Sequence, residues 1–390
     1  MSAFSVTGEF SVRILKVLND NRQMVSLLAY DTMRGVKFTI TLKNDDIPVS
    51  FSSELESSSP NKSFFEKVEE RYKVKYGLMD IKFHLHFLCQ NENKETRIHH
   101  RHFIIEDELG EGTYGTVFKL KDIESDENFA IKCVKYNNPH RVDNEIRILR
   151  MLRNSRNIIH FYGAVYLGLL NRVCLVTEHV DSIVMKDVLD SLDLDDIKYY
   201  SHQLLIAIDE CHKRNIVHGD IKPANVLIDI TTKELKLIDF GMAVSLGDNE
   251  SNKTNIGTLI YNAPELLLNY TLFDGAVDIW AFGCIFACAI FRLRRLFEGD
   301  TRKEVLQSIT SMLGSDHFFG YIGTYGIRMS VREMDDFTGF PVQTWDSLIT
   351  EENSDLAIAE AVDLIEHLLV FDHEKRISAE EAMKHSFFNQ

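Results

Sequence analysis

Two patterns of apolar positions divide the sequence. Up to about Val180, short apolar stretches rich in β-branched residues alternate with turn residues, a pattern that predicts strands. Beyond Asp187, apolar residues recur at helical spacing in long segments such as 195–213 and 357–370. One helix, around 143–153, interrupts the strand-rich part. The sequence therefore predicts an α+β protein in which strands come first and helices follow.

The first hundred residues are interpreted as a separate module. They contain no motif that indicates a function. We expect strands, and hence a small β-rich module, from the short alternating segments between turn residues. The expected elements are strands at 10–18, 24–30, 36–42 and 81–89 and a helix at 62–70. The predicted domains are thus 1–100 and 103–388.

Histidine pairs in this module leave one alternative open. His84 with His86, and His99 with His100, could bind a metal ion, because alternate strand residues share a face. No carboxylate or cysteine in the sequence pattern converges with them. Exposed histidines of a strand and a linker are the simpler interpretation.

Composition and charge exclude several classes. Residues 1–100 carry nearly equal numbers of acidic and basic side chains, so the whole of the net charge of −16 falls on the rest. Such an acidic body disfavours binding to nucleic acid or to an anionic membrane. The longest apolar run, 279–291, is too short to span a bilayer and predicts a buried helix.

Cysteine usage points to a reducing compartment. The six cysteines contain no C-x-x-C pair, and the first residues show no secretory signal. We therefore expect reduced thiols and a cytoplasmic and/or nuclear location. Cys284 and Cys288, four residues apart in the apolar run, are expected in the core rather than as metal ligands.

A glycine-rich segment supplies the first candidate chemistry. Glycines let backbone amides approach phosphate oxygens closely, because no Cβ intervenes. The G-x-G-x-x-G pattern alone is weak evidence, since dinucleotide-binding folds share it and open a helix after the third glycine. Here 116–120 continues as a strand, which favours a nucleoside triphosphate loop. Its residues are Gly110, Glu111, Gly112, Thr113, Tyr114 and Gly115.

A lysine and a glutamate follow the glycine-rich segment at positions where they could contact a nucleotide and each other. Lys132 lies on the next apolar strand, where it could reach the α- and β-phosphates of a nucleotide. Glu145 lies on the following helix and could pair with Lys132. Taken singly, each would more simply be a solvated surface residue, so the argument depends on the whole series.

The most specific segment is His218-Gly-Asp220-Ile-Lys222-Pro-Ala-Asn225. Asp220 is placed as catalytic base and orienter of an acceptor hydroxyl, and Lys222 as a counter-charge for the γ-phosphate. Asn225 offers an amide oxygen to Mg²⁺. A following apolar strand delivers Asp239 as the main Mg²⁺ ligand, and oxygen ligands with phosphates suit this ion.

Further matches complete an ordered series that chance does not explain: Gly257-Thr258, Ala263-Pro264-Glu265, Asp278-Ile-Trp280, Gly283 and Arg376. The chain resembles eukaryotic protein kinases over about three quarters of its length, and Lys222-Pro223 is typical of the serine/threonine type. The resemblance implies a two-lobed fold, with a small β-rich N-lobe and a large helical C-lobe. It also implies transfer of the ATP γ-phosphate to serine or threonine hydroxyls of protein substrates, with Mg²⁺.

The same resemblance assigns further roles. Adenine would lie against apolar residues, and the backbone of Glu178 and Val180 in the hinge would contact its edge. Thr177 would guard the inner pocket, Thr258 would lie near Asp220 and Lys222, and Glu265 would pair with Arg376. The apolar adenine contacts are Leu109, Val117, Ala130 and Leu227.

Within this superfamily the chain resembles catalytic subunits of the casein kinase II family. The matching segments, in order, are 290–292, 297–299, 313–314, 371–376 and 381–385. By that family's pattern, an arginine is replaced here by Gly219 and a tryptophan by Phe240. Residues 136–143 hold one arginine, and no basic residue lies between Lys253 and Glu265. We therefore expect only weak selection for acidic residues around the acceptor.

Gly219 also removes the arginine that meets an activation-segment phosphate in many kinases. We expect activity without phosphorylation of that segment, which would be ordered by packing, by residues 1–100 or by a regulatory partner chain. Two other classes stay open at this stage. A pseudokinase scaffold is disfavoured because all the catalytic residue types are retained, and a primary interaction role for residues 1–100 has no motif to support it.

Overall fold

The computed structural model describes residues 12–21, 24–31, 36–43, 83–86, 100–112, 115–135, 139–167, 172–247 and 256–389. The chain divides into two compact units. The first unit comprises Met1–Ile146 and His160–His179, and the second comprises Arg147–Ile159 and Val180–Gln390. The helix expected at 62–70 lies outside the described residues.

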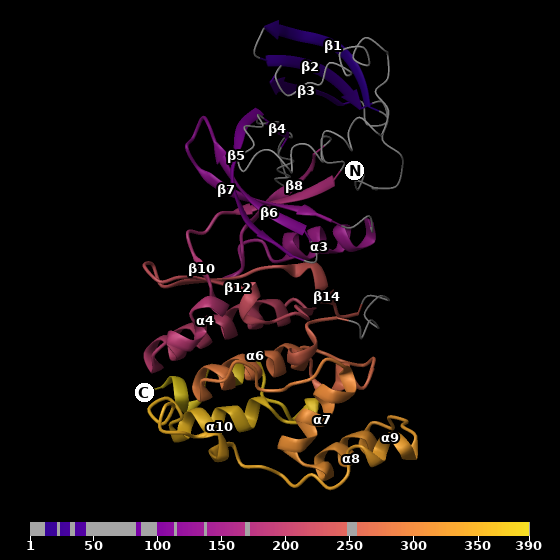
Figure 1. Ribbon diagram of the computed structural model, residues 1–390, viewed down its shortest axis with the longest axis vertical. Helices are drawn as coiled ribbons and strands as arrows, with labels where there is room; N and C mark the ends of the chain where they lie inside the picture. Colours follow the sequence, from indigo (N-terminus) through magenta and orange to yellow (C-terminus); the bar gives the residue numbers. More distant parts are fainter. Residues whose placement is uncertain are drawn as a thin grey trace. The chain divides into compact units, whose positions relative to one another are not determined.

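A three-stranded antiparallel sheet begins the first unit (Figure 1). Its strands follow in chain order as β1 (Val12–Asn21), β2 (Met24–Asp31) and β3 (Val36–Lys43). They agree with the three strands expected from the sequence. The fourth expected strand corresponds to β4 (Phe83–His86), whose residues His84 and His86 lie in register with His102 and His100.

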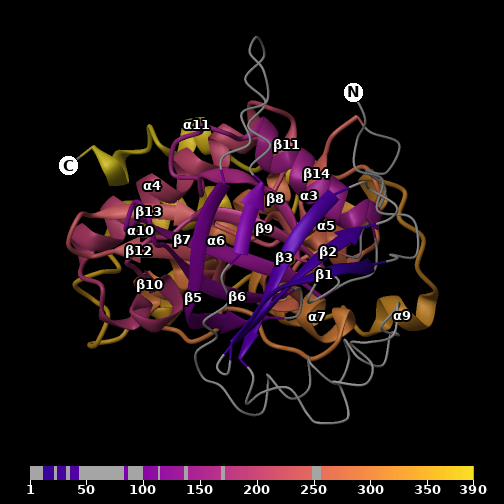
Figure 2. The same ribbon diagram turned by 90° about the horizontal axis from the view of Figure 1, so that it is seen from above.

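A six-stranded antiparallel sheet in the first unit contains the glycine-rich segment and Lys132 (Figure 2). Its order is β4-β5-β6-β7-β9-β8, so β7 lies between β6 and β9. Alternate residues of β7 are buried, as expected for a strand with one face on a core. Phe103, Leu120, Ile131 and Cys174 form that core with their neighbours. The bounds are β5 (His100–Glu111), β6 (Gly115–Asp122), β7 (Asn128–Val134), β8 (Phe161–Leu167) and β9 (Arg172–Glu178).

Helix α3 (Pro139–Met151) begins four residues earlier than the sequence pattern predicted. Proline lacks an N–H, and the first turn of a helix has no acceptor for one, so proline is tolerated there. Val142 and Ile148 are buried on the apolar side of α3. Its Glu145 is buried as well, although a surface glutamate was the simpler expectation for this position taken alone.

Helices α4 (Leu194–His212), α6 (Ala276–Phe291) and α10 (Ala359–Leu368) form the centre of the second unit. Helix α6 packs against both of the others, as Figure 1 shows. Apolar residues surround α6 on all sides, and a helix of that kind is stable only when buried. The predicted helices at 195–213, 279–291 and 357–370 are confirmed within a few residues of their ends.

Shorter elements complete the second unit. Side-chain caps start several helices, because the first backbone N–H groups of a helix have no partner inside it. Asp193 caps α4, and Ser378 forms a capping box with Glu381. The remaining α-helices are α5 (Pro264–Leu267), α7 (Arg302–Leu313), α8 (Ser315–Thr324), α9 (Val331–Asp335) and α11 (Ala379–Ala382). The short strands are β10 (Ile183–Val184), β11 (Ile216–Val217), β12 (Val226–Asp229), β13 (Glu234–Leu237) and β14 (Val244–Ser245).

The two cysteines of α6 are core residues, as expected. Cys284 and Cys288 are both buried. Burial raises the pKa of the Cys284 thiol well above its usual value and that of Cys288 to about 12. Neutral thiols of this kind are poor metal ligands and poor nucleophiles. Within the described ranges, no helix is both long and apolar enough to cross a bilayer.

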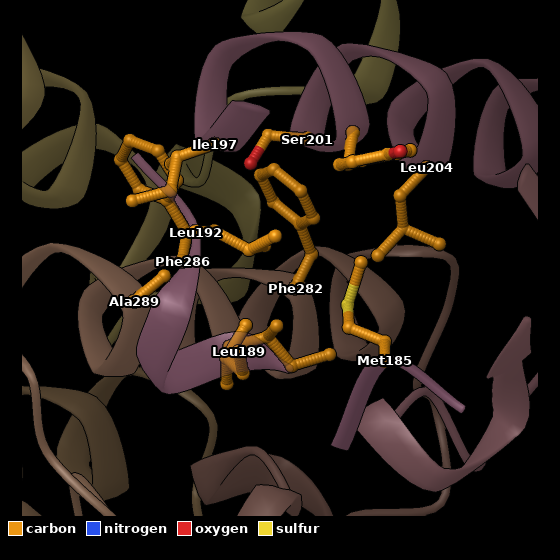
Figure 3. Close-up of a pocket in the computed structure, with 11 residues that line it drawn as sticks. Met185, Leu189, Leu192, Ile197, Ser201, Leu204, Phe282, Phe286 and Ala289 are labelled. Atoms are coloured by element: carbon orange, nitrogen blue, oxygen red, sulfur yellow. The ribbon is translucent and has the colours of Figure 1, made fainter. Parts of the chain in front are cut away.

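A small apolar cavity lies between α4, α6 and the segment that precedes α4 (Figure 3). Its volume of about 10 Å³ leaves room for roughly one water molecule. Tyr200 lines it, and its buried hydroxyl makes no hydrogen bond to any described residue. The labelled lining residues are Met185, Leu189, Leu192, Ile197, Ser201, Leu204, Phe282, Phe286 and Ala289.

A fully buried ion pair ties α5 to the C-terminal part of the second unit. Arg376 Nη1 lies 2.8 Å from Glu265 Oε1, and neither side chain is exposed. The same guanidinium donates to the carbonyl oxygens of Ala276 and Val370 and lies 5.1 Å from the Trp280 ring. The pairing implied by the family resemblance is therefore present.

We predict that Glu265→Gln destabilises the second unit strongly. Removing one partner leaves a buried charge without its counter-charge, which costs about 3–5 kcal/mol. The measurement is the free energy of unfolding in urea. Lys384→Met is the matched control, because Lys384 and Glu380 pair with mostly exposed side chains, and it should cost less than about 1 kcal/mol. Equal losses in the two variants would contradict the prediction.

Candidate active site

The glycine-rich segment spans the end of β5 and the beginning of β6 in the first unit. Gly110 lies opposite Val117 in the β5–β6 ladder, and the Gly112 N–H donates to the Gly115 carbonyl oxygen at 2.9 Å. No helix opens after the third glycine, so the structure excludes the dinucleotide-type arrangement. A Cβ at Gly115 would lie 2.6 Å from the Cys133 carbonyl oxygen, so this position admits only glycine without a shift. Thr113 and Tyr114 lie outside the described residues.

Lys132 and Glu145 form an ion pair in the same unit. Lys132 Nζ lies 2.7 Å from Glu145 Oε1, with only 15% and 5% of the two side chains exposed. Strand β7 presents the lysine and helix α3 presents the glutamate. A carboxylate held by a helix can keep a long lysine side chain extended, which suits contact with phosphates.

Other nucleotide candidates lie on neighbouring strands. Ala130 lies opposite Thr177 in the ladder of β7 and β9, one residue before Glu178. The Glu178 N–H donates to the His160 carbonyl oxygen, and the Glu178 carboxylate accepts from the His160 N–H at 2.8 Å. Leu109 is an exposed apolar residue of β5, with 47% of its surface accessible. In the second unit, Val180 follows this segment and Leu227 lies on β12.

The catalytic-loop residues form one hydrogen-bonded cluster in the second unit. Asp220 Oδ2 accepts from Lys222 Nζ at 2.7 Å, and Asp220 Oδ1 accepts from Thr258 Oγ1 at 2.7 Å. Lys222 Nζ also donates to Thr258 Oγ1 at 2.9 Å. Asn225 Nδ2 donates to the Asp220 backbone carbonyl oxygen at 2.8 Å. Thr258 therefore lies where the family resemblance implied.

The oxygen donors suit a divalent cation. Because the Asn225 NH₂ group donates to Asp220, its amide oxygen points elsewhere, and it makes no hydrogen bond to any described residue. The Ile238 N–H donates to the backbone carbonyl oxygen of Asn225 at 2.9 Å, which links Asn225 to the residue before Asp239. Asp239 adopts a left-handed backbone conformation with φ 64°. An amide oxygen and a carboxylate are hard ligands that fit Mg²⁺.

Asp278 of α6 binds the backbone of this loop at the residues that precede Asp220. Its carboxylate accepts from the backbone N–H groups of His218 at 2.8 Å and Gly219 at 2.9 Å. His212 Nε2 lies 3.0 Å from the same carboxylate. Burial alone would raise the pKa of Asp278, but the bonds from His212 and Gly219 hold it below the usual value. Asp278 thus stays ionised and positions the residues around Asp220.

Gly219 makes the loop fit the activation segment closely. Its φ is +73°, and a Cβ there would lie 3.0 Å from Ile256 Cδ1 and 3.2 Å from the Met242 carbonyl oxygen. Gly257, with φ +79°, approaches so closely that a Cβ would lie 2.7 Å from the Gly219 carbonyl oxygen. Packing of Ile256 therefore occupies the place beside Gly219 where the family's arginine would begin.

Asn262 completes this contact. It is buried and donates from Nδ2 to the Ile256 carbonyl oxygen at 3.1 Å. The sequence interpretation did not assign roles to Ile256, Asn262 or His212. The two glycines, Gly219 and Gly257, were the available signal, because a close backbone approach in this segment needs residues without a Cβ.

Fold and site together define a protein kinase. The protein kinase domain family matches residues 103–388, and the chain belongs to this family. The chain is 34% identical to casein kinase II subunit alpha' of Saccharomyces cerevisiae over 280 residues, which cover 72% of this chain and 82% of that relative. The protein is accordingly a serine/threonine protein kinase that resembles the casein kinase II catalytic subunit. It uses ATP, a divalent metal ion and protein substrates, as its family does.

We predict that Gly219→Ala lowers both stability and kcat. A Cβ would strain the left-handed backbone of Gly219 by about 1–2 kcal/mol. It would also press on Ile256 and on the Met242 carbonyl oxygen, and so displace the residue that precedes Asp220. Gly247→Ala is the matched control, since Gly247 also has a positive φ of 97° but no atom within 4 Å of its Cβ position. We expect the control to lose only stability.

The measurements are urea unfolding and steady-state kinetics on one peptide substrate. Gly219→Ala should lower kcat at least tenfold, because small displacements of catalytic groups slow the reaction strongly. Similar kcat values for the two variants would show that the contact with Ile256 does not position the loop.

Proposed function

We propose that Asp220, Lys222, Asn225 and Asp239 perform Mg²⁺-dependent transfer of the ATP γ-phosphate to a serine or threonine hydroxyl. The observation that carries the proposal is the cluster of Asp220, Lys222 and Thr258, whose side chains lie within 2.7–2.9 Å of one another. Such a cluster holds a carboxylate and an ammonium side by side, as in-line phosphoryl transfer requires.

Asp220 is the proposed base. The acceptor hydroxyl donates its proton to the Asp220 carboxylate as its oxygen forms the new bond to the γ-phosphorus, and ADP leaves as the old P–O bond breaks. Thr258 and Asn225 hold the carboxylate in one orientation. The Lys222 ammonium neutralises charge on the transferred group. Phosphoryl transfer needs positioning and charge neutralisation more than covalent chemistry, and these residues supply both.

Mg²⁺ is the proposed metal ion, with Asn225 and Asp239 as its protein ligands. Two oxygen donors are enough, because Mg²⁺ keeps water molecules and takes further ligands from phosphates. When bound, the ion would neutralise charge on the nucleotide phosphates. The Asn225 amide oxygen supports this assignment, since the orientation of its NH₂ group is set by the Asp220 carbonyl.

Nucleotide binding is assigned to residues of the glycine-rich segment and its neighbours. Lys132, held by Glu145, contacts the α- and β-phosphates, and Gly110, Gly112 and Gly115 supply backbone N–H groups with Glu111, Thr113 and Tyr114. The apolar side chains of Leu109, Val117, Ala130 and Leu227 contact adenine, and the backbone of Glu178 and Val180 reads its edge. The short Lys132–Glu145 distance of 2.7 Å supports the role of the lysine.

The proposal extends to the domain organisation, a partner chain and the location in the cell. Residues 1–100 form a module distinct from the kinase domain at 103–388, and a regulatory partner chain is an additional candidate for contact with the protein. The name of the yeast relative, a subunit, supports a partner. Reduced cysteines support a cytoplasmic and/or nuclear location.

We predict that Asp220→Asn and Lys132→Met each abolish phosphate transfer while the fold is kept. Loss of the base or of the phosphate contact should lower kcat/KM by about 10²–10⁴-fold or more. Turnover is measured as ADP release with a peptide substrate, and folding as the urea midpoint. Lys119→Met is the control, because Lys119 is a lysine of the same sheet that pairs with Glu106 instead. Near-normal turnover in either catalytic variant would refute its assignment.

A second prediction concerns substrates. The preferred acceptor should be serine or threonine, with only weak selection for acidic neighbours, because 136–143 holds one arginine and 255–261 holds no basic residue. A randomised peptide library incubated with the full chain, ATP and Mg²⁺ measures both preferences. A profile dominated by Glu or Asp on the C-terminal side would contradict the weak acidic selection. Robust tyrosine phosphorylation would contradict the first half.

A third prediction is that activity does not need phosphate on the activation segment. Gly219 offers no charged partner, and Ile256 already packs beside it. We expect the Ser245/Ser251/Thr254 triple alanine variant to match both dephosphorylated and phosphorylated wild type in kcat/KM. A tenfold advantage of phosphorylated wild type, about 1.4 kcal/mol of transition-state stabilisation, would refute it. Ser251 and Thr254 lie outside the described residues.

A further inference from the structure

Asp363, His367 and His385 converge on the surface of the second unit, and none of them belongs to the catalytic loop. One ring nitrogen of each histidine and one carboxylate oxygen of Asp363 all lie within 4.8 Å of one another. The exposed fractions of the side chains are 53% for Asp363, 54% for His367 and 11% for His385. In the part of the chain that the structure describes, no other group of three His, Cys, Asp or Glu residues meets this condition.

Two segments far apart in the sequence build the cluster. Asp363 and His367 are four residues apart on α10, so they share one face of that helix. His385 caps the short 3₁₀ helix Ser386–Phe388. Phe387 is fully buried, and its ring lies 5.0 Å from that of Phe286 in an edge-on contact, which anchors this segment. The buried Phe387 therefore holds His385 beside α10.

A hydrogen bond sets the tautomer of His367. Its Nδ1 lies 2.8 Å from the Asp363 backbone carbonyl oxygen and 3.8 Å from Asp363 Oδ1. A carbonyl oxygen only accepts, so Nδ1 carries the proton and Nε2 keeps its lone pair. Histidines that bind metals generally donate their other N–H to a carbonyl or carboxylate in this manner. Binding through Nε2 therefore leaves this bond intact, whereas binding through Nδ1 requires that the bond be given up.

His385 already faces the carboxylate. Its Nε2 lies 2.9 Å from Asp363 Oδ2, and its Nδ1 accepts from the Phe387 N–H at 3.3 Å. Coordination through Nε2 would move the ring proton to Nδ1 and release that cap contact. The contact is longer than a usual N–H hydrogen bond, so little is lost.

We propose that Asp363, His367 and His385 bind a divalent transition-metal ion, with Zn²⁺ as the best fit. Two imidazole nitrogens and one carboxylate oxygen form a common three-residue zinc set, and a water molecule can fill the fourth tetrahedral position. Mg²⁺ and Ca²⁺ prefer all-oxygen sites and fit poorly. The bound ion would link α10 to the segment that ends the chain, and so stabilise the second unit.

The test uses the full chain after removal of metals with a chelator. Zn²⁺ is titrated in competition with a chromophoric chelator, and Co²⁺ is followed by visible absorption, which reports coordination directly. His367→Asn is the main variant, because His367 is half exposed and its replacement should not affect folding. His317→Asn is the matched control, since His317 is an exposed histidine of α8 outside the cluster.

The expected result is that wild type and His317→Asn each bind one equivalent of Zn²⁺ more than His367→Asn, or bind it at least tenfold more tightly. Zn²⁺ should also raise the Tm of those two proteins more than that of His367→Asn. Histidines of residues 1–100 are the same in all three proteins, so their binding cancels in the comparison. The proposal is overturned if His367→Asn binds Zn²⁺ and Co²⁺ as wild type does, or if His317→Asn loses the same equivalent.

Asp363→Asn provides a second, independent reading, because it keeps the side-chain shape and removes one ligand charge. We expect it to weaken Zn²⁺ binding at least tenfold and leave the metal-free urea midpoint close to that of wild type. Unchanged affinity in Asp363→Asn would contradict the assigned ligand set. Should this variant fold poorly, the comparison of His367→Asn with His317→Asn still decides the matter.

Discussion

The carboxylate of Asp278 is the interaction on which the catalytic half of the protein depends. It is fully enclosed in the core around α6 and accepts two backbone N–H groups of the catalytic loop together with a contact from His212. A buried carboxylate without such donors would be costly, so loop and carboxylate stabilise each other. Because α6 is packed on all sides, the loop that carries Asp220 shares its rigidity. Positioning of this kind is what phosphoryl transfer most requires.

Close packing joins the described part of the activation segment from Ile256 onward to the catalytic loop. Gly219 and Gly257 both have positive φ, a Cβ at Gly257 would lie 2.7 Å from the Gly219 carbonyl oxygen, and a Cβ at Gly219 would press on Ile256. Ile256 and Asn262 then fill the surrounding space, and Thr258 reaches Asp220. Many kinases use an arginine and a phosphate at this place. Here Gly219 stands in place of that arginine, and the apolar side chain of Ile256 fills the space beside it.

The second unit buries polar groups in two contrasting ways. Arg376 has a carboxylate, three carbonyl oxygens and an aromatic face as neighbours, so its charge is compensated although its side chain is fully buried. Tyr200 is the contrasting case, since its buried hydroxyl has no hydrogen-bond partner among the described residues. A cavity with room for about one water molecule lies beside it. The Asp363, His367 and His385 cluster lies at the surface, where a ligand can enter.

By itself the sequence determined the class of protein, the order of strands and helices, and the residue types of the catalytic series. These are local properties: glycine spacing, apolar periodicity and short motifs act within a few residues of one another. The family resemblance also implied that Glu265 pairs with Arg376, 111 positions away, and that Thr258 lies near Asp220, 38 positions away, and the structure has both contacts. Only the tertiary structure decided the contacts of Ile256, Asn262 and His212 around the catalytic loop. Such contacts depend on how whole elements pack, and no local pattern encodes that. The same holds for His385 beside Asp363, because the segment that carries His385 is placed by the packing of Phe387 against Phe286 of α6.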